Sequence, residues 1–539
     1  MPTFFGPPRD SEQGLGALTI AGLLEESAAR HPDREAICFS EDGLTTRWTY
    51  GTLLAESRQL AKALVADGIG KGTRVALLMG NRPQWVQVAF GVAMAGGVLV
   101  PVNTLFESPE IEYVLRHSDT AVVLHQESLL RHPYGEQLRS FEASLPFLRA
   151  RHCLHTPGYD AFLEAGKAVS DEVLDRRLRE LSPTDDALIV YTSGTTGRPK
   201  GVVHMHRAPA IQSWRFAVQL RLDPTVRVWS AFPFFWTAGF CMVMGATLAA
   251  GGCLVLQEAF DAGQAMGLIE RERVTTAYAW PHQSAALEAH PDWLSRDFSS
   301  LWQVDGFSAL SRHPTVQAND SWSPRAAYGL TETFTIVSSV PADTSPAERQ
   351  GHEGTILPGN AIRIVDPDTG RSLPAGAAGE IHVKGPTLMR GYLKVAPEEV
   401  FDPDSYFPTG DAGYVDEAGR LHWTGRMTEL IKTGGANVSP VEIENELLQH
   451  PGLHSARAVG VEHPTLGEEV VLCAVVKPGI EVTAEELKEF LRGKLASYKL
   501  PRHVLFFREE DLVLTGNAKI KVDDLRALAR ARLTGSASC

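Results

Sequence analysis

The segment ALIVYTSGTTGRPKGVVH, residues 187–204, constrains the fold more than any other part of the chain. It starts with an apolar, partly β-branched run, which predicts a buried strand. The run leads directly into a loop of Gly, Ser and Thr that is closed by one lysine. A flexible linker is the simplest alternative for such small side chains. Because ligand sites of α/β proteins lie where buried strands end, we interpret the segment as a strand and a ligand-binding loop.

The chemistry of this loop suits phosphate. Glycines allow turns that point successive N–H groups at one anion, and Lys200 adds a point charge. The spacing is not that of a Walker loop, because Gly194 is not followed five residues on by Gly-Lys-Ser/Thr. We therefore expect a polyphosphate site with a different architecture.

The rest of the sequence predicts an α/β fold in several parts. Helix-like and strand-like segments alternate over residues 18–123 and again from the phosphate loop to about residue 340, which favours layered sheets. Residues 354–415 change to short alternating strands with turns such as DPDTG, which indicates a β-rich subdomain. The last hundred or so residues form a small α+β unit, in which Ser439 and Pro440 begin a helix. We place the boundary between residues 1–426 and 427–539.

Composition narrows the classes of function and location. The formal net charge of -14 argues against nucleic acid and acidic membranes as partners. The start of the chain lacks the pattern of a signal peptide, and no apolar run reaches the roughly 18 residues of a membrane span, so we expect a cytoplasmic protein. Its six cysteines are far apart and form no CxxC pair, which predicts reduced thiols and no zinc site.

Four further stretches carry chemistry: YGLTET (328–333), YFPTGD (406–411), GRMTELIKTGGAN (425–437) and LTGNAKIK (514–521). Singly each is weak, since Asp411 could be a turn acid and Lys519 a solvated surface charge. With the phosphate loop, in this order, they resemble the adenylate-forming superfamily of acyl-CoA synthetases, peptide-synthetase adenylation domains and beetle luciferases. The resemblance runs from about Leu18 to Arg526 and is strongest to acid–CoA ligases.

The resemblance implies a large N-terminal domain, a small mobile C-terminal lid and a two-step reaction. A carboxylate attacks the α-phosphate of ATP to give an acyl-adenylate and pyrophosphate, and the thiol of coenzyme A then displaces AMP. A free carboxylate is a poor electrophile because its leaving group would be oxide. The first step replaces that leaving group with AMP, which leaves readily. Because two anions must meet, catalysis depends on charge neutralisation and alignment.

The same resemblance assigns roles to matching residues. Lys519, Thr331, Glu332 and Lys200 match catalytic positions, and Glu332 with Thr196 would hold Mg²⁺. The loop Lys432, Gly434, Gly435 and Asn437 would face the site during thioester formation. Lys519 would bridge ATP and the carboxylate, and Asp411 and Arg426 would bind ribose. The expected ATP-binding set is Thr192, Ser193, Gly194, Thr195, Thr196, Gly197, Lys200, Gly306, Phe307, Ser308, Tyr328, Gly329, Leu330, Thr331, Glu332, Asp411, Arg426 and Lys519.

Departures from the family pattern lie at the acyl pocket and the hinge. Trp236 stands where an aromatic-His pair is common, and Gly306-Phe307 where Gly-Gly is common. An apolar wall rewards apolar acids, so we expect a bulky apolar acid unless Trp236 is core filling. The hinge position holds Thr428 instead of Asp or Lys, which could slow lid rotation, be permissive, or reflect a shifted register. The expected pocket residues are Phe234, Phe235, Trp236, Gly239, Gly306, Phe307 and Gly329.

Several alternatives stay open at this point. The acyl group could pass to a carrier-protein thiol or a partner ligase, and the chain could carry out mainly the first half-reaction. A luciferase-like oxygenase needs a special acyl partner. Intact Lys200, Glu332 and Lys519 argue against an inactive ATP-binding regulator. GFSAL at residue 306 lacks the last glycine of a hydrolase elbow. Besides a small carboxylic acid, a homodimer partner is left open.

Overall fold

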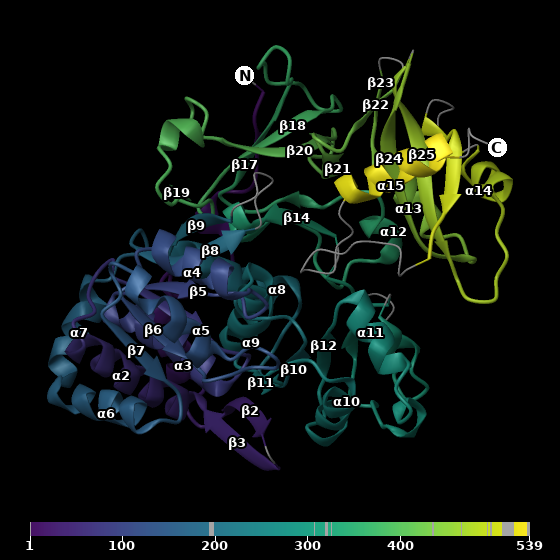
Figure 1. The fold of residues 1–539 in the computed structure, drawn as a ribbon. Helices are drawn as coiled ribbons and strands as arrows, with labels where there is room; N and C mark the ends of the chain where they lie inside the picture. Colours follow the sequence, from purple (N-terminus) through teal and green to yellow (C-terminus); the bar gives the residue numbers. More distant parts are fainter. Residues whose placement is uncertain are drawn as a thin grey trace. The chain divides into compact units, whose positions relative to one another are not determined.

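The computed structural model describes residues 2–41, 43–192, 199–306, 308–317, 322–324, 326–433, 436–464, 466–492, 494–495, 499–508 and 522–535. The chain forms two compact units (Figure 1). The N-terminal unit comprises Phe5–Ala361 and Val383–Phe407. The C-terminal unit comprises Met1–Phe4, Ile362–His382 and Pro408–Cys539.

A seven-stranded sheet forms the first layer of the N-terminal unit. Its strands follow the order β19 (Gly391–Tyr392), β9 (Lys200–Met205), β8 (Asp186–Thr192), β5 (Val98–Pro101), β4 (Arg74–Leu78), β6 (Val122–His125) and β7 (Ala150–Cys153). The strands from β8 to β7 pair in parallel, whereas β9 pairs antiparallel with both β8 and β19. The apolar run at residues 187–191 is therefore a strand of this sheet, as predicted.

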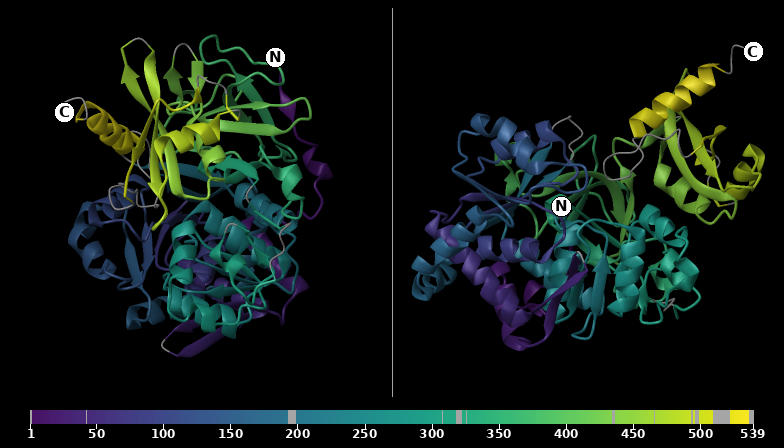
Figure 2. Two further views of the ribbon diagram at one scale, coloured as in Figure 1. Left: turned by 90° about the vertical axis from the view of Figure 1, so that its right-hand side faces the viewer. Right: turned by 60° about the horizontal axis from the view of Figure 1, so that its bottom comes forward.

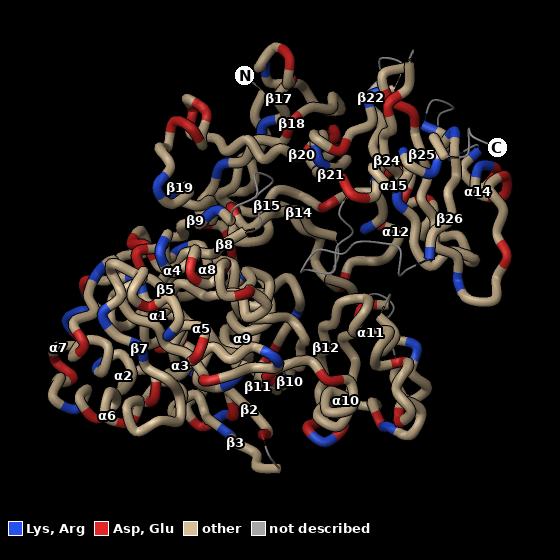
Figure 3. The backbone as a smooth tube through the Cα atoms, in the orientation of Figure 1, with Lys and Arg blue, Asp and Glu red and all other residues tan. Residues whose placement is uncertain are grey.

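Both faces of this sheet are buried, which explains why its strands are apolar without alternation. In β4, Val75 and Leu77 belong to one core cluster and Ala76 and Leu78 to another. The second cluster contains side chains of α4 (Ser108–His117) and α5 (Tyr134–Phe141). The only Lys, Arg, Asp or Glu in β4, β5 and β6 is Arg74. Charged residues are frequent in the outer helices α6 (Pro157–Ala165) and α7 (Asp171–Glu180) (Figure 3).

A six-stranded sheet forms the second layer. Its order is β13 (Gln303–Val304), β12 (Thr276–Tyr278), β10 (Arg227–Ser230), β11 (Cys253–Leu256), β2 (Glu35–Glu41) and β3 (Leu44–Thr49), with only β3 antiparallel. One continuous core cluster joins both sheets to α1 (Ile20–Arg30), α2 (Tyr50–Ala66), α3 (Pro83–Ala95), α8 (Arg207–Gln219) and α9 (Ala246–Ala250). Side chains of α10 (Ala262–Arg271) and α11 (Pro281–Glu288) form a further cluster with this sheet. The predicted layered α/β fold is confirmed.

Two smaller features complete this unit. A three-stranded antiparallel sheet comprises β14 (Ala327–Leu330), β15 (Thr335–Ser339) and β16 (Thr355–Ile356), and the short helix α12 spans Pro346–Arg349. The two most apolar stretches of the sequence lie around residues 88–102 and 240–256. The first forms α3–β5, and the second forms a π-helical turn, Ala238–Gly245, followed by α9–β11. Among the described residues, no helix is both long and apolar enough to cross a bilayer.

The C-terminal unit contains two five-stranded sheets. The first follows the order β1 (Phe4–Phe5), β17 (Ala361–Val365), β18 (Gly379–Lys384), β20 (Phe407–Val415) and β21 (Leu421–Arg426). It corresponds to the predicted β-rich subdomain. The second follows β23 (Ala436–Val438), β22 (Ile431–Thr433), β25 (Gly467–Val476) and β24 (Leu453–His463), with β26 (His503–Phe506) beside β25.

Helices cover both faces of the second sheet. α13 (Pro440–Leu447) and α14 (Ala484–Leu491) contribute to one core cluster, and α15 (Val522–Gly535), yellow in Figure 2, contributes to the other. The predicted helix start at Ser439 is confirmed, because its side-chain oxygen caps α13. Thr483 caps α14 in the same way. β24 contributes side chains to both clusters, with Ala458 on one face and Val459 on the other.

Candidate active site

The phosphate-loop segment is the connection of an antiparallel hairpin. β8 ends at Thr192 and β9 begins at Lys200, and these two residues are partners in the register. The loop residues Ser193, Gly194, Thr195, Thr196 and Gly197 lie outside the described part. The exposed Lys200 is therefore the first residue of β9, where pairing with β8 fixes its backbone.

A tyrosine joins Lys200 to the predicted magnesium ligand. The Lys200 ammonium lies 4.8 Å from the centre of the Tyr392 ring. The Tyr392 hydroxyl donates a 2.7 Å hydrogen bond to Oε1 of Glu332. Tyr392 is held in place because β19 pairs with β9, opposite Val202. Lysine, tyrosine and glutamate, far apart in sequence, therefore form one cluster.

The backbone at Thr331–Glu332 is fixed by three neighbouring segments. His204 Nε2 donates to the carbonyl of Thr331 at 2.8 Å, and the amide of Met389 donates to the carbonyl of Glu332 at 2.7 Å. Gln212 donates to the carbonyl of Thr333 at 3.1 Å. Complete burial lowers the pKa of His204 to about 3, so the ring is neutral and positions the backbone without adding charge.

Gly329 allows the YGLTET segment to fold against itself. A Cβ atom at this position would lie 1.6 Å from the carbonyl oxygen of Thr335 in the paired strand β15. The register shifts between Tyr328 and Gly329, and Phe334 takes a left-handed conformation with φ 48°. Tyr328 is buried in β14, and Leu330 ends that strand. The tight hairpin directs Thr331 and Glu332 away from β14 as a separate turn.

The predicted adenine-side segment follows the end of β13. Ser308 caps a short 3₁₀-helix, Ala309–Arg312, and its hydroxyl lies 3.1 Å from that of Ser284 on α11. A Cβ atom at Gly306 would meet nothing within 4 Å, so this position borders open space. Phe307 lies outside the described residues.

Aromatic side chains gather at the predicted acyl pocket. The Trp236 ring lies 5.2 Å from Phe235 and 6.3 Å from Trp280, in both cases edge-on. Trp280 stacks on Phe232 at 4.4 Å. Trp280 is 37% exposed and Trp236 is half-buried, so both present surface to solvent. We call Phe232, Phe235, Trp236 and Trp280 the aromatic wall.

Two neighbouring positions support this wall from behind. Phe234 is 1% exposed and packs edge-on against Trp85 at 5.3 Å. Its assignment to the pocket is corrected, because this ring fills the core. At Gly239 a Cβ atom would lie 2.0 Å from the carbonyl oxygen of Pro233, so only glycine lets the two backbones approach. Asn81 fixes the segment by donating to the carbonyl of Phe232 and accepting from the amide of Phe234.

The remaining described site residues belong to the C-terminal unit. Asp411 and Arg426 face each other in the β20–β21 register, with 3.0 Å between Oδ1 and Nε. Asp411 is buried, whereas the Arg426 side chain is 46% exposed. Thr428 is exposed in the turn after β21. Lys432 pairs with Asn437 in the β22–β23 register, and Gly434, Gly435 and Lys519 lie outside the described residues.

The predicted site did not include His204, Phe232, Trp280 or Tyr392. Trp280 lies two residues after the end of β12, and residues that follow a buried parallel strand are a usable signal for a ligand site. Tyr392 stands in a two-residue strand and His204 within an apolar strand. Their contacts arise only from tertiary packing.

Comparison with known proteins agrees with this geometry. Residues 24–393 match the family described as AMP-binding enzyme, and residues 442–519 match the AMP-binding enzyme C-terminal domain. The chain is 31% identical over 535 residues to a putative acyl-CoA synthetase, YngI, of Bacillus subtilis, covering 94% of this chain and 96% of that protein. It is 33% identical to a feruloyl-CoA synthase of an Amycolatopsis species, covering 89% and 94%. ATP-bound MatB from Rhodopseudomonas palustris superposes with a TM-score of 0.75 at 27% identity, covering 94% and 98%.

Proposed function

The chain belongs to the AMP-binding enzyme family, and we propose that it activates a bulky apolar carboxylic acid at the aromatic wall. The enzyme is an AMP-forming acid–CoA ligase. The carboxylate oxygen attacks the α-phosphorus of ATP and pyrophosphate leaves, which gives an acyl-adenylate. The thiol sulfur of coenzyme A then attacks the acyl carbon, its proton passes to solvent, and AMP leaves with the bonding electron pair.

The assignment of catalytic roles rests mainly on one contact, the hydrogen bond from Tyr392 to Glu332 beside Lys200. Adenylation brings a carboxylate to a polyphosphate, so the site must offer positive charge and fixed donors. Lys200 supplies charge at the end of the phosphate loop, and Thr331 supplies a hydroxyl on a backbone held by His204. Tyr392 is a positioning residue, because it fixes one oxygen of Glu332.

Glu332 fits the carboxylate ligand of a magnesium ion. Oε1 accepts from Tyr392, and among the described residues Oε2 accepts no hydrogen bond, so an oxygen is left for a hard cation. Thr196 of the phosphate loop is the second expected ligand. When bound, Mg²⁺ would neutralise phosphate charge. The chain's own contribution is to hold the Glu332 carboxylate at a fixed place.

The ribose and lid roles extend the proposal to the C-terminal unit. The buried Asp411 carboxylate is oriented by Arg426, which suits a group that accepts two ribose hydroxyls. Lys519 is the proposed adenylation lysine, and the loop 432–437 the proposed thioester-stage loop. Both assignments rest on the family motifs that these residues match.

The aromatic wall supports the choice of acid. Burying apolar ligand surface contributes about 25 cal/mol per Å², and edge-on ring contacts add roughly 0.5–1.5 kcal/mol. Trp236 and Trp280 offer both, because their edge-on rings are each partly exposed. Acetate is too small to gain from such a wall, and an ammonium group next to it would lose hydration. The named substrate class of the feruloyl-CoA synthase relative is also aromatic.

The test is pyrophosphate release with a panel of acetate, amino acids, medium-chain acids and aromatic acids, together with coenzyme A consumption. We expect aromatic or other bulky apolar acids to be best. Trp236→Ala and Trp280→Ala should raise KM for the preferred acid by about 10-fold, the equivalent of 1.4 kcal/mol, and leave KM for ATP unchanged. Trp302→Ala, which removes a 39% exposed tryptophan outside the wall, is the control. Highest activity with acetate or a free amino acid would refute the substrate class.

A further inference from the structure

A histidine and a cysteine end two neighbouring strands at the edge of the seven-stranded sheet. His125 is the last residue of β6 and Cys153 the last of β7, and the two are partners in the parallel register. Glu127 follows β6 on the same side of the chain as His125. The sheet order places β5, β4 and β6 between the phosphate-loop strand β8 and the edge strand β7. This group is therefore separate from the candidate active site.

The three side chains converge. One ring nitrogen of His125, Sγ of Cys153 and a carboxylate oxygen of Glu127 all lie within 4.8 Å of one another. The Cys153 thiol donates to Oε2 of Glu127 at 3.5 Å. In tetrahedral zinc sites, bond lengths of about 2.0–2.3 Å separate ligand atoms by roughly 3.5 Å, so only small side-chain movements are needed.

The hydrogen bonding of His125 leaves a lone pair for a metal. Nδ1 lies 2.9 Å from the carbonyl oxygen of Gln126, and a carbonyl only accepts, so Nδ1 carries the proton. Nε2 is therefore an acceptor, and it is buried without a hydrogen-bond partner in the described part of the chain. An N–H···O=C bond on the other ring nitrogen is how metal-binding histidines are usually oriented.

Charge and access also suit a divalent cation. Oε1 of Glu127 accepts from Arg139 at 3.2 Å, which leaves Oε2 on the side of Cys153. The nearby Arg151 is paired with Glu142 at 2.9 Å. The Glu127 side chain is 58% exposed and Cys153 is partly exposed, so an ion and a water ligand can enter from solvent. A Cys153 thiolate and the Glu127 carboxylate would together neutralise the two positive charges of such an ion.

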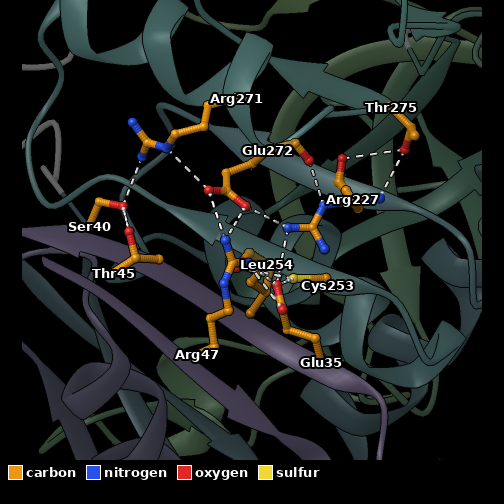
Figure 4. Close-up of polar contacts among 10 residues, drawn as sticks. All are labelled: Glu35, Ser40, Thr45, Arg47, Arg227, Cys253, Leu254, Arg271, Glu272 and Thr275. Atoms are coloured by element: carbon orange, nitrogen blue, oxygen red, sulfur yellow. Dashed lines mark hydrogen bonds and ion pairs between the residues drawn. The ribbon is translucent and has the colours of Figure 1, made fainter.

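We call a second group in the same unit the saturated cluster, and Figure 4 shows the arginines around its two carboxylates. Atoms of Glu35, Cys38 and Glu272 also lie within 4.8 Å of one another. There, however, Glu272 accepts from Arg47 at 2.9 Å, from Arg227 at 3.1 Å and from Arg271 at 3.2 Å, and Glu35 accepts from Arg47 and Arg227. Three guanidinium groups already neutralise these carboxylates and would repel a cation.

Against the expectation from cysteine spacing that the chain has no zinc site, we propose that His125, Glu127 and Cys153 bind a zinc-class transition-metal ion, with water as the fourth ligand. Imidazole, thiolate and carboxylate are a zinc ligand set and do not suit Mg²⁺. Binding forms bonds from Nε2, Sγ and Oε2 to the ion, and the thiol proton leaves to the buffer. The ion would join the ends of β6 and β7 at an exposed sheet edge.

The experiment titrates the full-length protein, stripped of metal, with Zn²⁺ against a chromophoric chelator, and with Co²⁺ as a spectroscopic probe. We expect one tight site, a thiolate-to-cobalt charge-transfer band, and about one proton released in calorimetry in two buffers. Cys153→Ala and Glu127→Gln should each weaken binding at least about 10-fold, since even loss of an outer contact costs that much.

Cys38→Ala and Glu272→Gln, taken from the saturated cluster, are the matched controls and should keep full affinity. Thermal unfolding and pyrophosphate release of each metal-free variant verify the fold, and Glu127→Gln keeps the test valid if Cys153→Ala unfolds. Equal zinc affinity in wild type and both ligand variants, or no thiolate–cobalt band in wild type, would overturn the site. Excess Mg²⁺ should not compete, and effective competition by Mg²⁺ would also overturn it.

Discussion

At the scale of single residues, Tyr392 is the side chain whose effect is most specific. Its hydroxyl bonds Glu332 and its ring faces Lys200, so the two contacts can be separated by substitution. Tyr392→Phe keeps the ring and removes only the hydrogen bond. A hydrogen bond to a charged group is worth about 1.5–3 kcal/mol, so we expect adenylation to slow by about 10-fold or more and to need more Mg²⁺.

Pyrophosphate release measured over a range of Mg²⁺ concentrations checks this expectation. Tyr406→Phe is the control, because Tyr406 also lies beneath a lysine, Lys384 at 5.5 Å, in the same unit. An unchanged rate and Mg²⁺ dependence in Tyr392→Phe would show that the hydroxyl does not position Glu332.

At the scale of secondary-structure elements, the β14–β15 hairpin determines where Thr331 and Glu332 lie. Gly329→Ala would place a methyl group 1.6 Å from the Thr335 carbonyl oxygen. The nearest atoms all belong to the backbone of β15, so no flexible side chain can move aside. The hairpin must therefore open. We expect adenylation to fall by more than about 100-fold, the scale of losing an oriented electrostatic group, with a lower unfolding temperature.

The matched control is Gly267→Ala in α10, where a Cβ atom would meet nothing within 4 Å. Alanine is favoured over glycine in a helix by roughly 1 kcal/mol, so this variant should be as stable as wild type or more so. Wild-type activity in Gly329→Ala would mean that the hairpin is not needed to place Glu332.

At the scale of the whole molecule, the two half-reactions are assigned to different parts of the C-terminal unit. Lys519→Ala should slow adenylate formation by about 100- to 1000-fold, while thioester formation from a supplied acyl-adenylate changes much less. Lys488→Ala, at a partly exposed lysine paired with Glu485, is the control. Equal loss in both half-reactions would mean that Lys519 has a structural role.

The hinge prediction concerns lid rotation between those half-reactions. Thr428 is exposed in a turn and has no charge to pair differently in two poses, so we expect acyl-CoA formation to be slower than adenylation. Thr428→Lys should then speed the second step. Single-turnover rates of both steps test this, and equally fast steps in wild type would show that threonine is permissive. The lid boundary at residues 426–427 stays a prediction.

Much of the fold could be predicted because it is encoded locally. Strand β8, helices α2 and α3 and the caps at Ser439 and Thr483 follow from periodicity and capping chemistry within a few residues. β7 was missed, because its sequence ARHC has no apolar run and an edge strand needs none. Phe234 was misplaced, since sequence alone does not tell a pocket aromatic from a core aromatic in the run FPFFW.

The sequence by itself determined the family chemistry, because the phosphate loop and the YGLTET motif are each continuous and need their residues in fixed order. Only the tertiary structure decided which side chains act on them. Tyr392 reaches Glu332 through β19 pairing with β9, Trp280 meets Trp236 across two strand ends, and Cys153 lies beside His125 through parallel pairing. The physical reason is that sheet pairing joins residues far apart in the chain, and no local pattern specifies that partner.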